Sequence, residues 1–324
     1  MIVAADAPDA VSRWHPEGPA FWVTRPRRTL RAFTHAPAAI RFDPSLPPGV
    51  TRWTFSHDAH EGRVVVTFNE PASVSRLLIR WRLLADVIQK LAQSDRSLAF
   101  RDVLIDLGDG VGTDAPPNLR AFARRPGSRA RLIPNPYLLR PRPWLGPPLP
   151  WACKTDTVYF RGTSTGAVDY DANARVALCR VAQRMPRADC RVSRIKQVDA
   201  HFAARLEAEG LVGWRLPLWT MNRHRFLVEA DGNSSSWDRY MLIGSFGGVP
   251  IRFECEWEEC WHGLLVDGVN CVTADRRSLP EVVDRLRSRP LEAVAIAKAA
   301  SRTVAESLSR RHLQRQFRDA LVTA

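Results

Sequence analysis

Short apolar strands and amphipathic helices alternate through the second half of this sequence, and this alternation constrains the fold more than any other feature. The strand patterns lie at 157–161, 190–195, 225–230, 249–253 and 263–266, and helical patterns lie at 173–184, 198–210 and 237–243. Strands separated by single helices are typical of a parallel sheet with helices on both faces. Ligands of such sheets bind beyond the carboxyl ends of the strands. We therefore expect an α/β fold with its binding site in the loops after those strands.

Polar residues suited to anion binding follow the first of these strands. The segment 159–166 reads YFRGTSTG, and its candidate ligand residues are Arg161, Gly162, Thr163 and Ser164. A guanidinium fork, hydroxyl groups and free backbone N–H groups at a strand end can bind one anion, for which a phosphate is the best candidate. The alternative is that Arg161 pairs with Asp169 or Asp171 and only fixes the loop.

A second polar loop follows the strand pattern at 225–230. The chain continues through an Asp-Gly-Asn turn into three serines, a short helix and a Gly-rich turn. The candidate donor-binding residues here are Asp231, Gly232, Ser234, Ser235 and Ser236. Serines can cap a helix N-terminus, where the helix dipole favours a negative group. Two such loops in one sheet indicate a nucleotide-sugar site.

The first half of the sequence is organised differently. A strand pattern at 64–68, an amphipathic helix at 72–93 and a buried strand at 100–107 precede a proline-rich stretch at 132–151. Proline excludes regular helix and central strand, so we expect an inter-domain linker there. The expected division is an N-terminal domain at 1–145, a second domain at 146–290 and a C-terminal helix at 291–324 that could pack back on the first domain. A chain of 324 residues is long enough for two cores.

The net charge of +13 favours anionic partners. All of the 47 basic residues except Lys90, Lys154, Lys196 and Lys298 are arginine. A GC-rich genome explains part of this bias, and phosphorylated sugars or an anionic membrane surface fit it as well as nucleic acid does. The sequence has no zinc-finger, ribonucleoprotein or recognition-helix pattern, so we expect no nucleic-acid partner.

Metal, disulfide and membrane signals are weak. The six cysteines show neither CxxC spacing nor a finger pattern with histidine, and we expect them to be reduced. Asp169 and Asp171 form an Asp-x-Asp motif at the start of a helical pattern, where the helix dipole favours acidic residues. We therefore expect no metal and no other cofactor. No apolar run reaches the length of about 18 residues that a membrane span needs, and the N-terminus does not resemble a signal peptide.

Three segments resemble glycosyltransferase family 90, which includes protein O-glucosyltransferases, capsule-associated xylosyltransferases and lipopolysaccharide-modifying enzymes. The segments are WACKTDTVYFRGTSTG, RFLVEADGN and WEECWHGLLVDGVNCVTAD. They are similar to the family's aromatic-Arg-Gly-Ser/Thr block, to its donor-site strand and to the segment that follows this strand. The resemblance extends over about 100–300 with the same order and spacing.

Members of that family have two Rossmann-like domains facing a cleft, the GT-B arrangement, and invert the anomeric centre with a carboxylate of the N-terminal domain as base. The resemblance places this base at Asp109, in RDVLIDLGDGV. Asp106 replaces the family's asparagine, and Gly110 and Val111 replace the aromatic residue and proline that usually follow the base. Asp106, Asp114 or a structural role as a turn aspartate therefore remain alternatives.

The resemblance also implies how the donor is held. The C-terminal domain binds the nucleotide sugar, and without a metal arginines must stabilise the leaving diphosphate, with Arg161 as the first choice. The family has a second arginine after the small-residue loop; ungapped alignment places Ser236 there, and Arg239 lies three residues further along. Glu259 falls on the family's acidic position and would bind the ribose hydroxyls. The alternatives are surface positions on helices for Arg239 and Glu259.

The predicted function is that of an inverting, metal-independent glycosyltransferase. It would move a hexose or pentose from a nucleotide sugar, expected to be a UDP-sugar, to a polysaccharide or lipopolysaccharide-type acceptor. Asp109 would activate the acceptor, while Arg161 and the loop at 232–239 would stabilise the departing UDP. The expected location is the bacterial cytoplasm, with peripheral contact with the inner membrane. The alternative is a non-catalytic sugar- or nucleotide-binding protein on the same fold.

Overall fold

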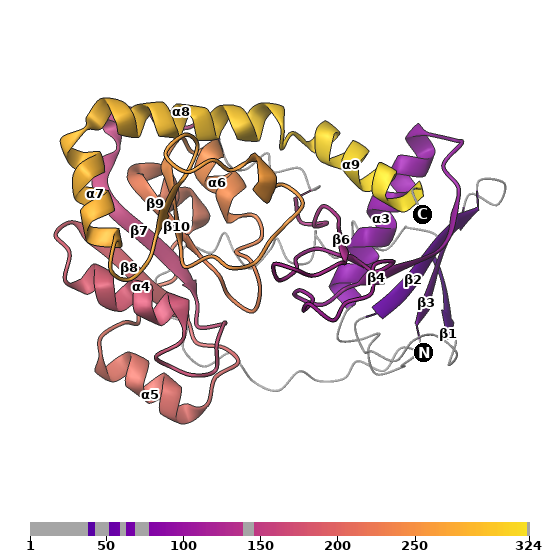
Figure 1. The fold of residues 1–324 in the computed structure, drawn as a ribbon, viewed down its shortest axis with the longest axis horizontal. Helices are drawn as coiled ribbons and strands as arrows, with labels where there is room; N and C mark the ends of the chain where they lie inside the picture. Colours follow the sequence, from indigo (N-terminus) through magenta and orange to yellow (C-terminus); the bar gives the residue numbers. More distant parts are fainter. Residues whose placement is uncertain (1–37, 43–51, 59–62, 69–77, 139–145, 323–324) are drawn as a thin grey trace, which may run out of the picture. The chain divides into compact units, whose positions relative to one another are not determined.

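The C-terminal half of the chain is built on a sheet in which every pair of neighbouring strands is parallel (Figure 1). The structure is a computed structural model that describes residues 38–42, 52–58, 63–68, 78–138 and 146–322. In sheet order the strands are β11 (Val272–Ala274), β10 (Val249–Phe253), β9 (His224–Ala230), β7 (Thr155–Thr163) and β8 (Ala188–Arg194).

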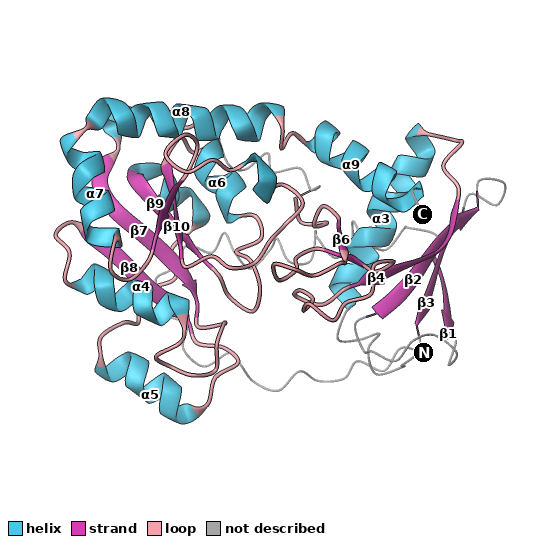
Figure 2. Cartoon of the chain, in the orientation of Figure 1, coloured by secondary structure: helices cyan, strands magenta, loops and turns pink. Residues whose placement is uncertain are grey.

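Helices cover both faces of this sheet, because successive strand residues point to opposite sides. Phe160 packs in a core with α4 (Ala174–Gln183) and α7 (Leu279–Ser288). Its neighbour Tyr159 packs in a second cluster with α6 (Arg239–Ser245). Figure 2 shows the helices arranged around these strands. The two remaining helices of this half are α5 (Ala200–Ala208) and α8 (Pro290–Glu306).

The strand order defines where a ligand can enter. Counted along the chain, the first strand of this sheet, β7, lies between the second, β8, and the third, β9. The connection from β7 therefore runs to one side of the sheet and the strands after β9 extend to the other. The loops at the carboxyl ends of β7 and β9 diverge at this switch point and leave a crevice between them.

The N-terminal half has a mixed sheet. In sheet order its strands are β1 (Ala38–Phe42), β3 (Arg63–Phe68), β2 (Arg52–Asp58), β4 (Phe100–Asp106), β5 (Arg120–Ala121) and β6 (Arg131–Leu132). Strand β2 is antiparallel to both of its neighbours, whereas the other pairs are parallel. The helices α3 (Leu78–Ser94) and α9 (Arg310–Val322) contribute buried residues to the same core as Trp53 and Phe55 of β2. The predicted α/β fold class is confirmed.

The predicted elements of the C-terminal half are found with small shifts of their ends, with two exceptions. The tail predicted as one helix forms α8 and α9, which are separated at Ser307–Ser309. The strand predicted at 263–266 is wrong: a 3-10 helix, η5 (His262–Leu264), occupies this place, and β11 forms later in the chain. Asn270 explains the difference, because its side chain bonds the backbone of Val266 and Leu264 and so uses groups that a strand would pair.

Two further short helices lie in the C-terminal half of the chain. The 3-10 helices η3 (Trp151–Cys153) and η4 (Leu218–Arg223) precede β7 and β9. The helix predicted at 72–93 is α3, whose predicted first turn lies outside the described residues, as does part of the predicted linker at 132–151. All described elements belong to one compact unit, Pro37–Ala324. The domain boundaries near 145 and 290 stay predictions. Across the described residues every helix is too short or too polar to span a bilayer.

Candidate functional site

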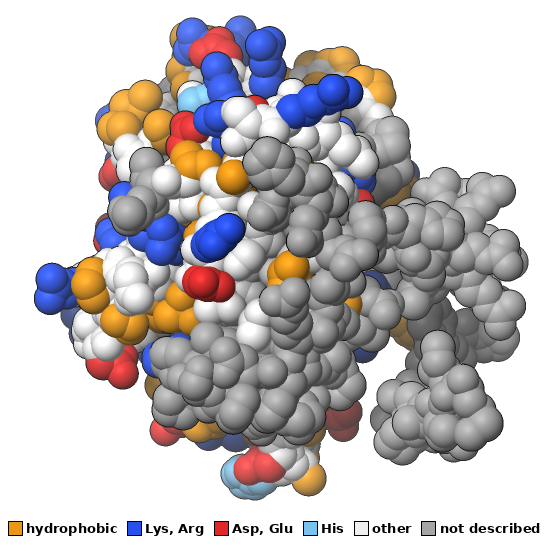
Figure 3. All heavy atoms as spheres, turned by 90° about the vertical axis from the view of Figure 1, so that its right-hand side faces the viewer, with side chains coloured by type: hydrophobic (Ala, Val, Ile, Leu, Met, Phe, Trp, Pro, Cys, Tyr) orange, Lys and Arg blue, Asp and Glu red, His pale blue; other side chains and the backbone are white. Residues whose placement is uncertain are grey.

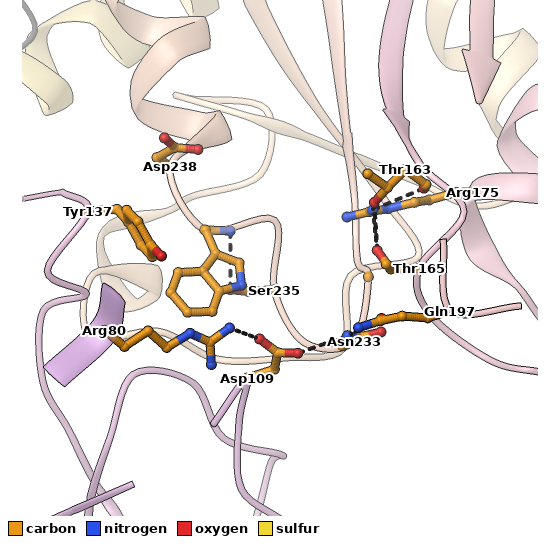
Figure 4. Close-up of a pocket in the computed structure, with 12 residues that line it drawn as sticks. Arg80, Asp109, Tyr137, Thr163, Thr165, Arg175, Gln197, Asn233, Ser235 and Asp238 are labelled. Carbon is orange, nitrogen blue, oxygen red and sulfur yellow. Dashed lines mark hydrogen bonds and ion pairs between the residues drawn. The ribbon is translucent and has the colours of Figure 1, made fainter. Parts of the chain in front are cut away.

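A pocket of about 360 Å³ lies where the loops after β7 and β9 meet the loop after β4 (Figure 4). Its lining residues are Arg80, Asp109 and Tyr137 from the N-terminal half, and Thr163, Thr165, Arg175, Gln197, Gly232, Asn233, Ser235, Trp237 and Asp238 from the C-terminal half. This is the edge of the sheet at which the strand order predicts a ligand. The lining is rich in hydrogen-bonding groups, as a site for a polar, charged ligand requires.

Arg175 brings a buried positive charge to this pocket. Its Nη1 donates to the hydroxyls of Thr163 and Thr165, both at 2.8 Å, and its Nε donates to the carbonyl of Ala230 at 3.3 Å. The residue is 8% exposed, and no carboxylate of the described residues lies within salt-bridge distance of its guanidinium. Burial, and after it the charge of Arg239, lowers the pKa of Arg175 to about 10, so the group is still cationic at neutral pH. A buried cation without a counter-ion is stabilised by an anionic ligand.

A glycine beside the guanidinium and an asparagine that caps α4 fix the position of Arg175. A Cβ atom at Gly232 would lie 2.6 Å from Nη2 of Arg175 and 3.0 Å from Oγ1 of Thr165, so a side chain there would displace this guanidinium. Asn173 caps α4 by accepting the backbone N–H groups of Arg175 and Val176. The cap fixes the first turn of the helix, from which Arg175 reaches the ends of β7 and β9.

Asp109 enters the pocket from the loop after β4. Its Oδ1 accepts a hydrogen bond from Nη2 of Arg80 at 2.5 Å, and its Oδ2 accepts one from Nδ2 of Asn233 at 2.8 Å. The same amide nitrogen of Asn233 donates to Oε1 of Gln197 at 2.8 Å. Figure 4 shows this chain of contacts along the floor of the pocket. The carboxylate is therefore held by residues from both halves of the chain.

The two alternative bases lie elsewhere. Asp106 is 6% exposed and its Oδ1 accepts the backbone N–H of Gly108 at 2.6 Å, so it stabilises the turn that precedes Asp109. Asp114 is exposed and does not line the pocket. The departure from the family pattern at Gly110 has a packing reason, because a Cβ there would lie 2.6 Å from the ring of Trp257. Of the three aspartates considered, Asp109 is the one that reaches the pocket.

An aromatic wall adjoins Asp109. The guanidinium of Arg80 lies over the ring of Trp237 at 4.9 Å, and the ring of Tyr137 meets Trp237 edge-on at 5.4 Å. The backbone of Trp237 has φ +63°, a left-handed conformation that is costly for a bulky residue. The surrounding contacts hold this conformation, which gives the pocket an apolar surface suited to a sugar ring.

The structure places Arg161 and Arg239 differently from the sequence prediction. Both terminal nitrogens of Arg161 are directed to Asp189: Nη2 bonds its two carboxylate oxygens at 2.7 Å each, and Nη1 bonds its carbonyl at 2.8 Å. Nη2 of Arg239 donates to the carbonyl of Arg161 at 2.8 Å. Neither residue lines the pocket. As a correction, the arginine that lines the pocket from the C-terminal half is Arg175, in the first turn of α4, and Arg161 ties β7 to β8 through Asp189, which is neither of the predicted aspartates.

Of the three other residues predicted in the β7 loop, Thr163 lines the pocket, whereas Gly162 and Ser164 support the loop. Gly162 accommodates the ring of Phe160, which a Cβ would approach to 2.5 Å. Oγ of Ser164 donates to the carbonyl of Lys196 at 2.8 Å and accepts its N–H at 2.7 Å. Ser164 is fully buried, so it joins the loops after β7 and β8 and does not meet a ligand.

In the β9 loop, Gly232 and Ser235 line the pocket, whereas the other predicted residues face inward. Asp231 accepts the backbone N–H of Glu256 at 2.6 Å, and burial raises its pKa to about 6. Ser236 donates to Glu229 at 3.0 Å. Ser234 is 1% exposed, and its hydroxyl has no hydrogen-bond partner among the described residues. These residues fix the loop that carries Ser235.

Several pocket residues escaped the sequence analysis. Arg175 left one signal, because a cation in the first turn of a helix opposes the helix dipole and so needs another reason to be there. Arg80 lies in α3, at a position of an amphipathic helix that no motif marks. Thr165 and Asn233 stand within the two loops that were singled out, and Gln197, with φ +59°, follows β8 without any motif. Their convergence depends on the order of strands in the sheet.

Glu259, predicted to bind ribose, lies behind the pocket wall. Its Oε1 shares a short hydrogen bond with Oγ of Ser235, and its Oε2 accepts Nε1–H of Trp261 at 3.1 Å. The residue is 3% exposed and does not line the pocket. Burial, followed by the charges of Glu229 and Asp238, raises the pKa of Glu259 to about 8. As a correction, Glu259 contacts Ser235 and not the space open to a ligand.

The raised pKa predicts how stability depends on pH. The folded protein holds the Glu259 proton more tightly than the unfolded chain, whose carboxyl titrates near 4.5. The free energy of unfolding should therefore fall between about pH 4.5 and 8, and the full penalty of ionising the buried acid should be present above pH 8. Glu259→Gln should remove this loss, so that urea denaturation at pH 5, 6.5 and 8 gives a growing difference between variant and wild type. A constant difference across that range would contradict the prediction.

Comparisons with known proteins give structural matches alone. No family model and no curated protein matches the sequence. Among solved structures, HepE of Anabaena in complex with UDP-glucose matches with a TM-score of 0.45 and 10% identity, over 88% of this chain and 99% of that one. WaaG, a glycosyltransferase involved in lipopolysaccharide biosynthesis, matches with a TM-score of 0.39 and 12% identity, over 65% and 58%. TarM matches with 0.41 and 11%, over 65% and 40%.

The matched structures differ in how much of them this chain spans. It spans nearly all of HepE, but less than two thirds of WaaG and less than half of TarM.

Proposed function

We propose that this chain is a glycosyltransferase that moves a sugar from a nucleoside diphosphate sugar, with a UDP-sugar as donor, to a hydroxyl of a polysaccharide or lipopolysaccharide-type acceptor. The observation that carries the proposal is a single pocket that combines the carboxylate of Asp109 with the buried guanidinium of Arg175. Sugar transfer needs these two groups, since a hydroxyl must lose a proton while a diphosphate gains charge. The resemblance of the β7 and β9 loops to family 90 supports the same reaction.

The proposed chemistry is a direct displacement with inversion. The acceptor oxygen attacks the anomeric carbon as Asp109 takes its proton, and the bond from that carbon to the diphosphate oxygen breaks. The electron pair of this bond leaves with UDP, where Arg175 and the hydroxyls of Thr163 and Thr165 stabilise the new charge. Arg80 and Asn233 orient Asp109 through their hydrogen bonds to its two oxygens. In this scheme guanidinium and hydroxyl groups stabilise the leaving group, and a metal is not required.

A ligand screen tests the donor assignment. Thermal unfolding is measured with UDP, GDP and CMP and with their sugars, each with and without a chelator. We expect UDP and one UDP-sugar to raise the melting temperature most, with no effect of the chelator. Stabilisation by none of the nucleotides would end the proposal, and stabilisation that disappears with chelator would end its metal-independent part.

One observation favours a second candidate, a protein that binds a nucleotide sugar without transferring it. Both carboxylate oxygens of Asp109 already accept a hydrogen bond, one from Arg80 and one from Asn233, as those of an aspartate with a purely structural role would. The two candidates differ in turnover: the transferase hydrolyses its UDP-sugar slowly in the absence of acceptor, whereas the binding protein leaves it intact.

The net charge also bears on the cellular location of the protein. We propose that the protein works in the bacterial cytoplasm, in peripheral contact with the inner membrane that carries the acceptor. Its net charge of +13 favours contact with an anionic lipid surface. On the face drawn in Figure 3, the coloured basic side chains are interspersed with acidic and apolar ones. Sedimentation with membranes that weakens with added salt would support this contact, and salt-independent recovery in the supernatant would exclude it.

A further inference from the structure

A buried hydrogen-bonded pair connects Glu259 to the pocket wall. Ser235 lines the pocket, and its Oγ meets Oε1 of Glu259 behind that wall. Oγ of Ser235 also accepts the backbone N–H of Trp237 at 3.3 Å, and Oε2 of Glu259 accepts Nε1–H of Trp261 at 3.1 Å. Both groups are nearly inaccessible, with Ser235 4% and Glu259 3% exposed. The pair is thus isolated from water on the side away from the pocket.

The number of hydrogens in this pair decides what Ser235 can offer to a ligand. A serine hydroxyl has one hydrogen to donate and two lone pairs, and an ionised carboxylate can only accept. When Glu259 is ionised, the single hydrogen of Ser235 is needed for the carboxylate. When Glu259 is protonated, the acid donates its own hydrogen to Oγ of Ser235, and the hydroxyl hydrogen of Ser235 becomes available to the pocket. Trp261 remains satisfied in both states, because Oε2 accepts its N–H in each.

We propose that Glu259 is a positioning residue of the donor pocket, which in its protonated form turns Ser235 into a hydrogen-bond donor for an oxygen of the bound diphosphate. The inference rests on the proposed function, since it assigns the anion of that pocket as the acceptor of the Ser235 hydrogen. Glu259 acts through Ser235 and does not touch the ligand. Loss of its proton withdraws one donor from the diphosphate.

The charged surroundings of Glu259 favour the protonated form at neutral pH. The charged groups that act on it are Glu229 from β9 and Asp238 from the start of α6, and both carry the same sign as its carboxylate. Glu229 is itself paired with Arg252 at 2.9 Å, so this arginine is engaged elsewhere. Among the described residues no basic group lies within salt-bridge distance of Glu259. Burial is the largest cause and these like charges add to it; together they raise the pKa of Glu259 to about 8, within a range in which binding can be measured.

The test measures UDP affinity by calorimetry at pH 7, 8 and 9 for the wild type and for Glu259→Gln. Glutamine keeps the protonated arrangement at every pH, because its amide N–H₂ donates to Ser235 and its amide oxygen accepts Trp261. From pH 7 to 9 we expect the wild-type affinity to fall about tenfold relative to that of the variant, which is the loss of protonated form for a group that titrates in the middle of this range. Titration of UDP itself is common to both proteins and cancels in the ratio. A ratio that stays constant over this range overturns the inference.

The variant Ser235→Ala provides an independent test of the same inference. Without the hydroxyl, the relative tenfold fall should disappear, and Glu259→Gln should have no pH-dependent effect in the Ser235→Ala background. A fall that persists in Ser235→Ala would show that Glu259 acts on the ligand by another route and would overturn the inference, even if Glu259→Gln failed to fold. A wild type that binds UDP at no pH would count against the proposed function itself, which separates that failure from a constant ratio with binding retained.

Discussion

Asp109→Asn is expected to lower turnover of the UDP-sugar by about 10²–10⁴-fold while UDP affinity stays within about threefold of the wild type. The amide cannot take the proton of an attacking hydroxyl, but it occupies the same volume and its oxygen still accepts from Arg80. Nδ2 of Asn233 also donates to Gln197, so the amides of Asn233 and Gln197 would turn together to keep the contact with residue 109. The lost ion pair with Arg80 is half-exposed, and its effect on stability should be at most about 1 kcal/mol. The rate at which UDP is released from the UDP-sugar identified by the ligand screen, followed by chromatography, measures turnover.

Asp114→Asn is the matched control for this experiment. Asp114 belongs to the same loop region as Asp109, but it is exposed and does not line the pocket. Its substitution should leave both turnover and UDP affinity unchanged. If Asp109→Asn retained turnover within a few-fold of wild type, the carboxylate would not be the base. If the wild type bound a UDP-sugar but never consumed it, the non-catalytic candidate would replace the transferase.

Arg175→Met should reduce UDP affinity by about two orders of magnitude, because one or two charge-assisted hydrogen bonds to the diphosphate are lost. The same substitution should change the free energy of unfolding by less than about 2 kcal/mol. Methionine loses the bonds to Thr163 and Ala230, but it also relieves the desolvation of a guanidinium that has no carboxylate partner among the described residues. Calorimetry with UDP and urea denaturation measure the two quantities separately.

Arg161→Met gives the opposite pattern and is the matched control. The guanidinium of Arg161 is bound by Asp189, and it lies outside the residues that line the pocket. We expect UDP affinity to change by less than about threefold and the loss of the ion pair to appear in stability. A large loss of UDP affinity in Arg161→Met, with binding retained in Arg175→Met, would restore the assignment made from the sequence and reject the one made from the structure.

The contrast between these arginines shows how far sequence reasoning reached. Strand β7, predicted at 157–161, and the loops that follow β7 and β9 were located correctly, because apolar runs bounded by Gly, Ser and Thr are local features. The arginine that lines the pocket from the C-terminal half, Arg175 of α4, was not predicted. Arg161 lies opposite Arg191 on the neighbouring strand, and its partner Asp189 lies opposite Tyr159, two positions earlier. No local pattern shows this pairing. The strand predicted at 263–266 is wrong for a different reason. The side chain of Asn270 bonds the backbone of Val266 and Leu264, and an apolar pattern does not reveal this competition.

The sequence alone determined the α/β alternation and the two polar loops at strand ends, because each depends on residues close together in the chain, whereas Asp109 was chosen from the resemblance to family 90. The tertiary structure alone decided that Arg175, Gly232 and Asp109 share one pocket, that Arg161 is bound by Asp189, and that Glu259 stands behind Ser235. These outcomes follow from the strand order, in which β7 lies between β8 and β9, and from burial, which sets the protonation of a carboxyl without a cationic partner. Neither is encoded by spacing along the chain, because both depend on which distant residues become neighbours when the sheet closes.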